Sequence, residues 1–277
     1  MKEYGGERPF FAKKDLTLED IRIVDGESGL KECSNITIRN CAFNGKYPLW
    51  HLHEGKVTHS VFESGSRAAI WYTRGLVMEN VTVDAPKMFR RCAGISLNKV
   101  TFSDALETFW DCEKVGLESC HFEKGDYLFM NSHDLKIENT VINGNYVFQN
   151  CTNVLIRNCR IITKDAFWES KDVLVENCYI ESEFLGWHST NLSLVNCEIS
   201  GSQPLCYADN LSLINCTMHE NCNLCFEYSS VNASVKGSIT SVKNPLTGCI
   251  EADAIGNVVD DENARLPHDC VIKIKGA

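Results

Sequence analysis

A short pattern of alternating apolar and polar residues returns along the chain at a fixed interval. The stretches VLIRNCRI, VLVENCYI, LSLVNCEI and LSLINCTM begin at Val154, Val173, Leu192 and Leu211, so the interval between them is constant. Related units begin at similar spacings near Leu16, Ile36, Gly55, Leu76, Ile95, Val115 and Leu135. A regular period of about 19–21 residues predicts a solenoid of stacked coils.

Each coil contains three short pieces in which apolar and polar residues alternate. In LSLVNCEISGSQPLCYADN, the pieces lie around Leu192, Cys197 and Leu205, and polar or glycine-containing corners separate them. Period-2 alternation in pieces this short predicts strands, and no stretch shows the longer period of an amphipathic helix. Stacked at a rise of ~4.8 Å, the strands are expected to form an all-β parallel β-helix of about eleven coils over residues 16–230.

The repeat predicts a single β-helix domain over residues 1–277. Residues 1–15 are expected to form an N-terminal cap, and residues 231–277, where the period is lost, the irregular last coils and a C-terminal cap. A solenoid end exposes unpaired backbone groups and needs such a cover. Leucine-rich repeats are the competing solenoid, but their back segment is helix-like. The back segments here, such as KDAFWESKD, are short and β-like.

Asparagine and cysteine occupy fixed columns of the repeat. Asparagine tolerates the left-handed backbone of a tight corner, and its amide can bond to the amide of the next coil, so a ladder is expected. The corner asparagines are Asn40, Asn80, Asn139, Asn158, Asn177, Asn196 and Asn215. The next position points inward, and its cysteines are Cys41, Cys120, Cys159, Cys178, Cys197 and Cys216. These columns specify the shape of the coil and not its function.

Composition narrows the functional classes. The chain has 37 acidic and 27 basic side chains and a net charge of -10, which argues against nucleic acid as a partner. It contains no run of 18 apolar residues, so no membrane-spanning helix is expected. The start MKEYGGERPFF lacks the apolar core of a secretory signal. The fifteen cysteines are therefore expected to be reduced and buried, and the predicted location is cytoplasmic.

The third piece of each coil differs from the other two in its chemistry. It holds every tryptophan of the chain, and ionisable residues flank these tryptophans. The strings RAAIWYT, APKMFRR, GDYLFMN, KDAFWES and SVKNP resemble a bacterial family of uncharacterised function, DUF3737, over nearly the whole chain. The resemblance implies a single-stranded right-handed β-helix of the pectin-lyase-like type. It implies no catalytic residue.

Three interpretations of this aromatic and charged side stay open. It could be a solvated sheet face with stacking between coils. It could be a carbohydrate groove, because indole rings beside carboxylates and cations suit sugar rings, hydroxyls and uronates. It could also be a surface for another protein. The working hypothesis is binding of, or action on, a carbohydrate such as a uronate-containing oligosaccharide, and the alternative is a non-catalytic scaffold.

If the protein is an enzyme, a glycoside hydrolase or a polysaccharide lyase is expected. Glu107 and Asp126 are interpreted as equivalent positions one coil apart, with carboxyl groups ~5 Å apart, as in a retaining glycosidase. Asp165 lies two coils beyond Asp126, roughly 10 Å away, near the upper limit for an inverting pair. Lys87 or Arg90 would be the base of a lyase. Alternatively, these cations only neutralise the acids.

The remaining candidates are residues expected to bind the substrate: Arg91, Trp110, Asp111, Trp168, His51, Trp71 and Trp187. The site is expected to centre on the coils from Lys87 to Trp168. No cofactor is predicted: Cys222-x-x-Cys225 resembles half a zinc site, but no second pair of ligands accompanies it. Acidic columns could bind Ca²⁺, although nothing in the sequence requires it. The expected partner is an oligosaccharide, with no nucleic acid and no membrane.

Overall fold

The structure is a computed structural model that describes residues 1–265, 267 and 269–276. The chain divides into two compact units, residues 1–144 (unit 1) and 145–277 (unit 2). Each unit is an all-β parallel β-solenoid, and the two contain about 14 turns. The described residues contain no α-helix, and their one 3-10 helix is η1 (Ser64–Ser66). The prediction of a β-helix is thereby confirmed, and that of a single domain stays a prediction.

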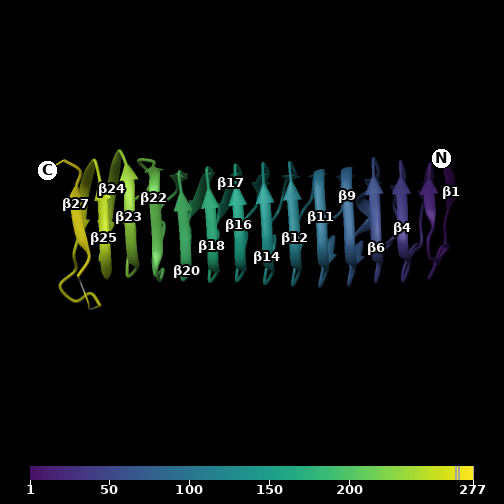
Figure 1. Cartoon of the computed structure of the whole chain (residues 1–277), viewed down its shortest axis with the longest axis horizontal. Coiled ribbons are helices and arrows are strands. Elements are labelled where there is room, and N and C mark those ends of the chain that lie inside the picture. Colours follow the sequence, from purple (N-terminus) through teal and green to yellow (C-terminus); the bar gives the residue numbers. More distant parts are fainter. Residues whose placement is uncertain (266, 268, 277) are drawn as a thin grey trace. The chain divides into compact units, whose positions relative to one another are not determined.

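In unit 1, successive coils place their strands side by side and parallel (Figure 1). The strands of the first side are β2 (Thr17–Glu19), β4 (Ser34–Arg39), β6 (His53–Thr58), β12 (Glu113–Glu118) and β14 (His133–Glu138). Those of the second side are β1 (Lys2–Tyr4), β3 (Ile21–Ile23), β5 (Ala42–Phe43), β7 (Val61–Phe62), β13 (His121–Phe122) and β15 (Val141–Asn143). Two long strands, β9 (Arg74–Val83) and β11 (Ala93–Phe102), run through the corner and belong to both sides.

Unit 2 has the same two strand-bearing sides. The first side contains β16 (Thr152–Arg157), β18 (Lys171–Glu176), β20 (Thr190–Val195), β22 (Leu211–Met218), β23 (Ser230–Lys236), β25 (Thr247–Ala252) and β27 (Val271–Ile274). The second contains β17 (Arg160–Lys164), β19 (Tyr179–Glu183), β21 (Glu198–Ser200), β24 (Ser238–Lys243) and β26 (Ala254–Val259). Val154 pairs with Val173, and Val173 with Leu192. The repeat seen in the sequence is therefore the register of the sheet.

Both chain ends contain strands that pair in parallel with the neighbouring coil, and the expected caps stay a prediction. Lys2 of β1 pairs with Ile21 of β3, so the first residues form a coil of their own. At the other end, Ser230 pairs with Thr247 and Cys249 with Val271. These last spacings depart from the period of the central coils because the loops between the strands change in length. The pairing of strands in neighbouring coils therefore continues where the sequence period is lost. The chain has more coils than the predicted eleven for this reason.

The third side is not a regular strand, contrary to the expectation of three strands per coil. Only the short β8 (Ile70–Trp71) and β10 (Phe89–Arg90) pair there as strands among the described residues. Elsewhere alternate residues are left-handed, as at Glu107 (φ 51°) and Phe109 (φ 58°). A left-handed L-residue costs roughly 1–2 kcal/mol. Backbone bonds between coils offset this cost, as when the Glu107 N–H donates to the Asp126 carbonyl at 2.9 Å.

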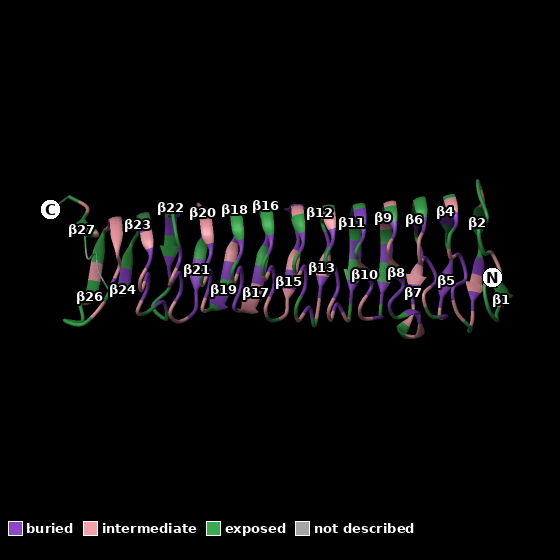
Figure 2. Ribbon diagram, turned by 90° about the horizontal axis from the view of Figure 1, so that it is seen from below, coloured by how far each residue is buried: buried purple, intermediate pink, exposed green. Residues whose placement is uncertain are grey.

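Buried residues alternate with more exposed ones along the strands of each unit (Figure 2), and the buried ones form its core. In unit 1, the buried rings of Phe89, Phe109 and Phe129 stack, with centroids 4.3 and 5.1 Å apart. In unit 2, Phe148 stacks on Phe167 at 5.1 Å. Thirteen of the fifteen cysteines are buried, and Cys249 and Cys270 are partly exposed. The predicted inward orientation of the cysteine columns is confirmed.

The predicted corner asparagines are left-handed, as at Asn177 (φ 55°) and Asn196 (φ 52°). The Asn196 Nδ2 donates to the Asn177 Oδ1 at 3.2 Å, and the Asn210 Nδ2 to the Asn191 Oδ1 at 2.8 Å. A continuous asparagine ladder stays a prediction. In these two contacts, the side-chain amide of a corner asparagine donates a hydrogen bond to the asparagine one coil away.

The cysteine column has a hydrogen-bonding role that its sequence position did not reveal. The Cys178 Sγ accepts the backbone N–H of Cys159 at 3.2 Å. In unit 1, the Ser60 Oγ accepts the N–H of Cys41 at 3.0 Å, in the same column. An acceptor at this position satisfies a buried N–H where the chain turns the corner. Val81 occupies the column in β9, where the strand runs straight through.

We expect Cys178→Val to lower the free energy of unfolding by about 1–3 kcal/mol, because the Cys159 N–H loses its acceptor. Cys178→Ser keeps an acceptor of similar size and is the matched control, with a smaller loss. Denaturant unfolding of both variants measures the difference. Equal stability would mean that the corner adopts the straight path of β9 and that the acceptor is not needed.

Candidate functional site

Trp50, Trp71, Arg90 and Trp110 form one column on the third side of unit 1. The backbone sets this register: the His51 N–H donates to the Trp71 carbonyl at 2.9 Å, and the Arg91 N–H donates to the Trp110 carbonyl at 2.9 Å. Because the flanking residues are left-handed, these side chains point away from the core while the apolar residue before each of them is buried. The aromatic column is therefore presented by a rigid hydrogen-bonded backbone.

The side chains of this column stack on one another. The Trp50 and Trp71 rings are nearly parallel, with centroids 5.3 Å apart and planes 10° apart. The Arg90 guanidinium lies 4.6 Å from the Trp71 ring and 4.5 Å from the Trp110 ring. Both faces of Trp71 are thus covered within the protein. A ligand can reach its ring edge but not its ring face, so Trp71 is a wall and not a platform for sugar stacking.

The indole nitrogens fix these rings in place. The Trp50 Nε1 donates to the Ala68 carbonyl at 2.6 Å, and the Trp71 Nε1 donates to the Lys87 carbonyl at 2.9 Å. Next to the column, the His51 ring stacks on Tyr72, with centroids 4.9 Å apart. Rings held by stacking and by a hydrogen bond lose little conformational freedom when a ligand binds. The site is pre-organised.

Charged candidates of unit 1 pair with one another. The Glu107 Oε2 lies 2.9 Å from the Lys87 Nζ and 3.4 Å from the Arg90 Nη2. The Asp111 Oδ2 lies 3.8 Å from the Arg91 Nε. Neutralisation of the acids by neighbouring cations, which the sequence left open as an alternative, therefore occurs for Glu107 and for Asp111.

The register corrects the expected equivalence of Glu107 and Asp126. The Lys87 N–H donates to the Leu106 carbonyl, and the Glu107 N–H to the Asp126 carbonyl. In a parallel pairing, the N–H of a residue bonds to the carbonyl of the residue just before its partner in the next coil. The partner of Lys87 is therefore Glu107, and the partner of Glu107 is Tyr127. All three are left-handed, and Asp126 lies one position before Tyr127. A shift of one residue changes the direction in which a side chain points.

A pocket opens beside Trp50 and Trp71. It has a volume of about 240 Å³ and is lined by Tyr47, Trp50, Arg67, Ala68, Trp71, Pro86 and Lys87. We call it the Arg67 pocket. Arg67 is exposed and has no ion-pair partner among the residues that the structure describes. The pocket combines an aromatic wall with an unneutralised guanidinium, which is the chemistry expected of a site for an anionic ring compound.

Five residues of the Arg67 pocket were not among the candidates from the sequence: Tyr47, Trp50, Arg67, Ala68 and Pro86. The strings KYPLW and SRAAIW contain the signal, a tryptophan with a cation a few residues before it. These strings predict a pocket only if they are known to lie in neighbouring coils, with the two tryptophans and the cations side by side. Of its lining residues, only Lys87 belongs to the coils on which the site was expected to centre.

Unit 2 contains the remaining candidates. Asp165 is 8% exposed, and its burial raises the pKa of its carboxyl, while Lys164 opposes this rise and Glu183 adds to it. The Trp168 Nε1 is buried without a hydrogen-bond partner among the described residues. The Trp187 Nε1 donates to the Gln203 carbonyl at 2.8 Å. These residues are aromatic or buried groups of the third side, as in unit 1.

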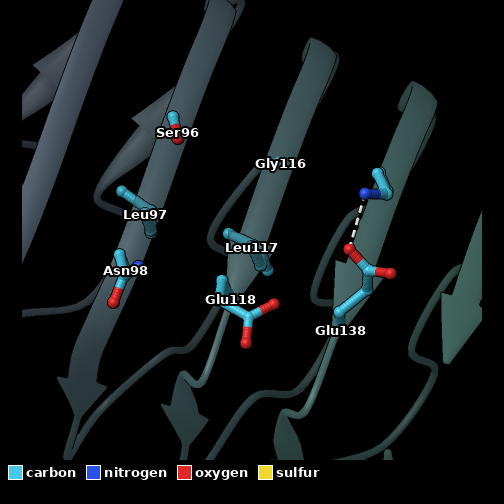
Figure 3. A pocket seen from close by; sticks show the side chains of 8 residues that line it. Ser96, Leu97, Asn98, Gly116, Leu117, Glu118 and Glu138 are labelled. Atoms are coloured by element: carbon cyan, nitrogen blue, oxygen red, sulfur yellow. Dashed lines mark ion pairs between the residues drawn. The ribbon is translucent and has the colours of Figure 1, made fainter. Parts of the chain in front are cut away.

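A second hollow lies on the first side of unit 1 (Figure 3). Its volume is about 170 Å³, and Gly116 leaves it open because a glycine has no side chain. The Lys136 Nζ lies 2.6 Å from the Glu138 Oε2 at its edge. The lining residues include no aromatic side chain. Since Lys136 is paired with Glu138 and no aromatic side chain lines the hollow, it is a weaker candidate than the Arg67 pocket.

The described part of the chain contains no group of three or more His, Cys, Asp or Glu side chains placed to hold a metal ion. Within the same residues, no helix has the length and hydrophobicity needed to cross a bilayer.

The profile of one protein family, described as Protein of unknown function (DUF3737), matches residues 1–273. The chain belongs to this family. The match confirms, over nearly the whole chain, the resemblance to DUF3737 that was noted in the sequence. No curated protein matches its sequence.

Solved structures similar to this DUF3737 protein share little sequence with it. The surface adhesin PfbA of Streptococcus pneumoniae aligns over 94% of this chain and 83% of its own, with 8% identity and a TM-score of 0.43. The A-module of the mannuronan C-5 epimerase AlgE6 of Azotobacter vinelandii aligns over 94% and 78%, with 12% identity and a TM-score of 0.37. The catalytic domain of a GH87 alpha-1,3-glucanase, solved with nigerose, aligns over 99% and 63%, with 11% identity and a TM-score of 0.33. Scores this low leave the function to be argued from the site itself.

Proposed function

We propose that the protein binds an acidic carbohydrate, such as an oligosaccharide with uronate units, in the Arg67 pocket. The observation that carries this proposal is an exposed Arg67 without an ion-pair partner among the described residues, at a pocket walled by Trp50 and Trp71. Arg22 and Arg74 of unit 1 have a carboxylate partner, and Arg39, which has no ion pair with a described residue, lies outside the pocket. In a chain with a net charge of -10, an unneutralised cation beside an aromatic wall favours an anionic ligand.

Each lining residue has a role that fits a sugar acid. The Arg67 guanidinium can hold a carboxylate with two parallel hydrogen bonds. The ring edges of Trp50 and Trp71, together with Pro86, offer an apolar surface for the C–H groups of a pyranose ring. The Tyr47 hydroxyl can exchange hydrogen bonds with sugar hydroxyls. Because the two indoles are fixed by Ala68 and Lys87, binding orders few side chains.

The geometry supports binding better than hydrolysis or elimination. The Glu107 carboxylate is shared between Lys87 and Arg90, and Arg90 lies between two indole rings. A general acid must give a proton to the substrate, and a lyase base must be free to take one. These groups are engaged with one another. Since we also propose a cytoplasmic location, the ligand would be an oligosaccharide that has entered the cell.

Titration of the intrinsic tryptophan fluorescence tests this proposal. We expect a trisaccharide of galacturonate to give a saturable change, because Trp50 and Trp71 line the pocket, and a higher salt concentration to weaken it. A neutral trisaccharide of glucose at the same concentrations should give no saturable change. If equilibrium dialysis and fluorescence both show no binding of the acidic trisaccharide, the proposal is wrong and the scaffold alternative is favoured.

A further inference from the structure

Lys87 is the second cation of the Arg67 pocket, and it differs from Arg67 in having a partner. Its Nζ lies 2.9 Å from the Glu107 Oε2. Glu107 does not line the pocket itself. The side chains of Lys87 and Glu107 are 42% and 24% exposed, so the pair lies at the edge of the pocket and in partial contact with solvent. One cation of the pocket is thus neutralised, and the other has no partner among the described residues.

Glu107 is held in its position by the aromatic column. The same Oε2 that contacts Lys87 lies 3.4 Å from the Arg90 Nη2. Arg90 cannot turn away easily, because its guanidinium lies between the Trp71 and Trp110 rings. The backbone also contributes, since the Lys87 N–H donates to the Leu106 carbonyl, next to Glu107. Arg90 therefore anchors Glu107, and Glu107 anchors the ammonium group of Lys87.

We infer that Glu107 sets the charge specificity of the Arg67 pocket, so that the pocket favours a sugar with a single carboxylate over a sugar with a doubly charged phosphate. The inference rests on the proposed function. The carboxylate of Glu107 cancels the attraction of Lys87 and repels a second negative charge on the ligand. Arg67 alone remains to bind an anion. With Glu107 neutral, both cations would face the ligand, and a doubly charged group would gain more than a singly charged one.

The test compares Glu107→Gln with the parent protein, using galacturonate, glucose 6-phosphate and neutral methyl glucoside as probes. We expect the parent to bind galacturonate more tightly than glucose 6-phosphate. In Glu107→Gln, the ratio of glucose 6-phosphate affinity to galacturonate affinity should rise about two- to fivefold, the range of an exposed ion pair. Neutral methyl glucoside should be bound equally weakly by both.

Glu113→Gln is the matched control. Glu113 also pairs with an arginine of unit 1, since its Oε1 lies 3.4 Å from the Arg74 Nη1, but it does not line the Arg67 pocket. This variant changes the net charge equally and should leave the affinity ratio unchanged.

The outcomes separate the two proposals. A parent that binds galacturonate while Glu107→Gln shows the same ratio, or loses both ligands equally, overturns the role of Glu107. The same holds for a parent that already prefers glucose 6-phosphate. A parent that binds neither galacturonate nor its trisaccharide overturns the proposed function and this inference with it.

Discussion

Replacing Phe109 by alanine is expected to lower the free energy of unfolding by about 3–5 kcal/mol. The Phe109 ring is fully buried and stacks on Phe89 at 4.3 Å and on Phe129 at 5.1 Å. Its loss leaves a cavity between two rings that the backbone holds in place. The Thr108 carbonyl next to it accepts the Phe129 N–H at 3.0 Å, so the coils cannot easily close the gap.

Chemical denaturation followed by circular dichroism measures this loss. Phe11→Ala is the matched control in unit 1, because the Phe11 side chain is 37% exposed. It should cost less than about 1 kcal/mol, as most surface substitutions do. Equal losses for the two variants would show that the stacked rings of the third side do not contribute more to stability than an exposed phenylalanine.

Replacing Arg67 by glutamine is expected to weaken binding of the acidic trisaccharide by about 10- to 100-fold. A hydrogen bond to a charged group contributes about 1.5–3 kcal/mol, and each 1.4 kcal/mol is a factor of about ten. Arg67 is exposed and has no ion-pair partner among the described residues, so the unfolding midpoint should stay the same. The expected effect is a loss of affinity without a loss of stability.

Fluorescence titration of the parent and of two variants checks this result. Arg39→Gln, an exposed arginine at the end of β4 and outside the pocket, removes the same charge and should bind like the parent. If Arg67→Gln binds as tightly as Arg39→Gln, the carboxylate of the ligand does not contact Arg67. The pocket would then not be the site of acidic sugar binding, even if the protein binds such a ligand.

The backbone of the third side could not be predicted from its own residues. A strand points successive side chains to opposite faces, and the alternation of Phe109 and Trp110 between inside and outside looks the same. Here it arises because alternate residues such as Glu107 and Phe109 are left-handed. Propensity disfavours this conformation for such residues. Only the hydrogen bonds to neighbouring coils stabilise it, and they depend on which coils are neighbours.

The candidate site depended on register more than on residue type. The sequence identified the third side, Trp71, Lys87 and Glu107 as chemically unusual, and these residues do lie in or beside the Arg67 pocket. It placed Asp126 opposite Glu107, but the hydrogen-bond register puts Asp126 one position off. One residue decides the direction of a side chain. Because the spacing between coils varies slightly along the sequence, that uncertainty exists in every coil.

The sequence by itself determined the solenoid, the strands of its first two sides and the buried cysteine columns. It could do so because alternation and a fixed period are properties of the chain that stacking preserves, as in the pairing of Val154 with Val173 and of Val173 with Leu192. Only the tertiary structure decided that both faces of Trp71 are covered, that Glu107 joins Lys87 to Arg90, and that Arg67 has no partner among the described residues. Those features depend on contacts of a few ångströms between side chains from three coils. Because the loops between strands differ in length, the sequence does not show which side chains come into contact.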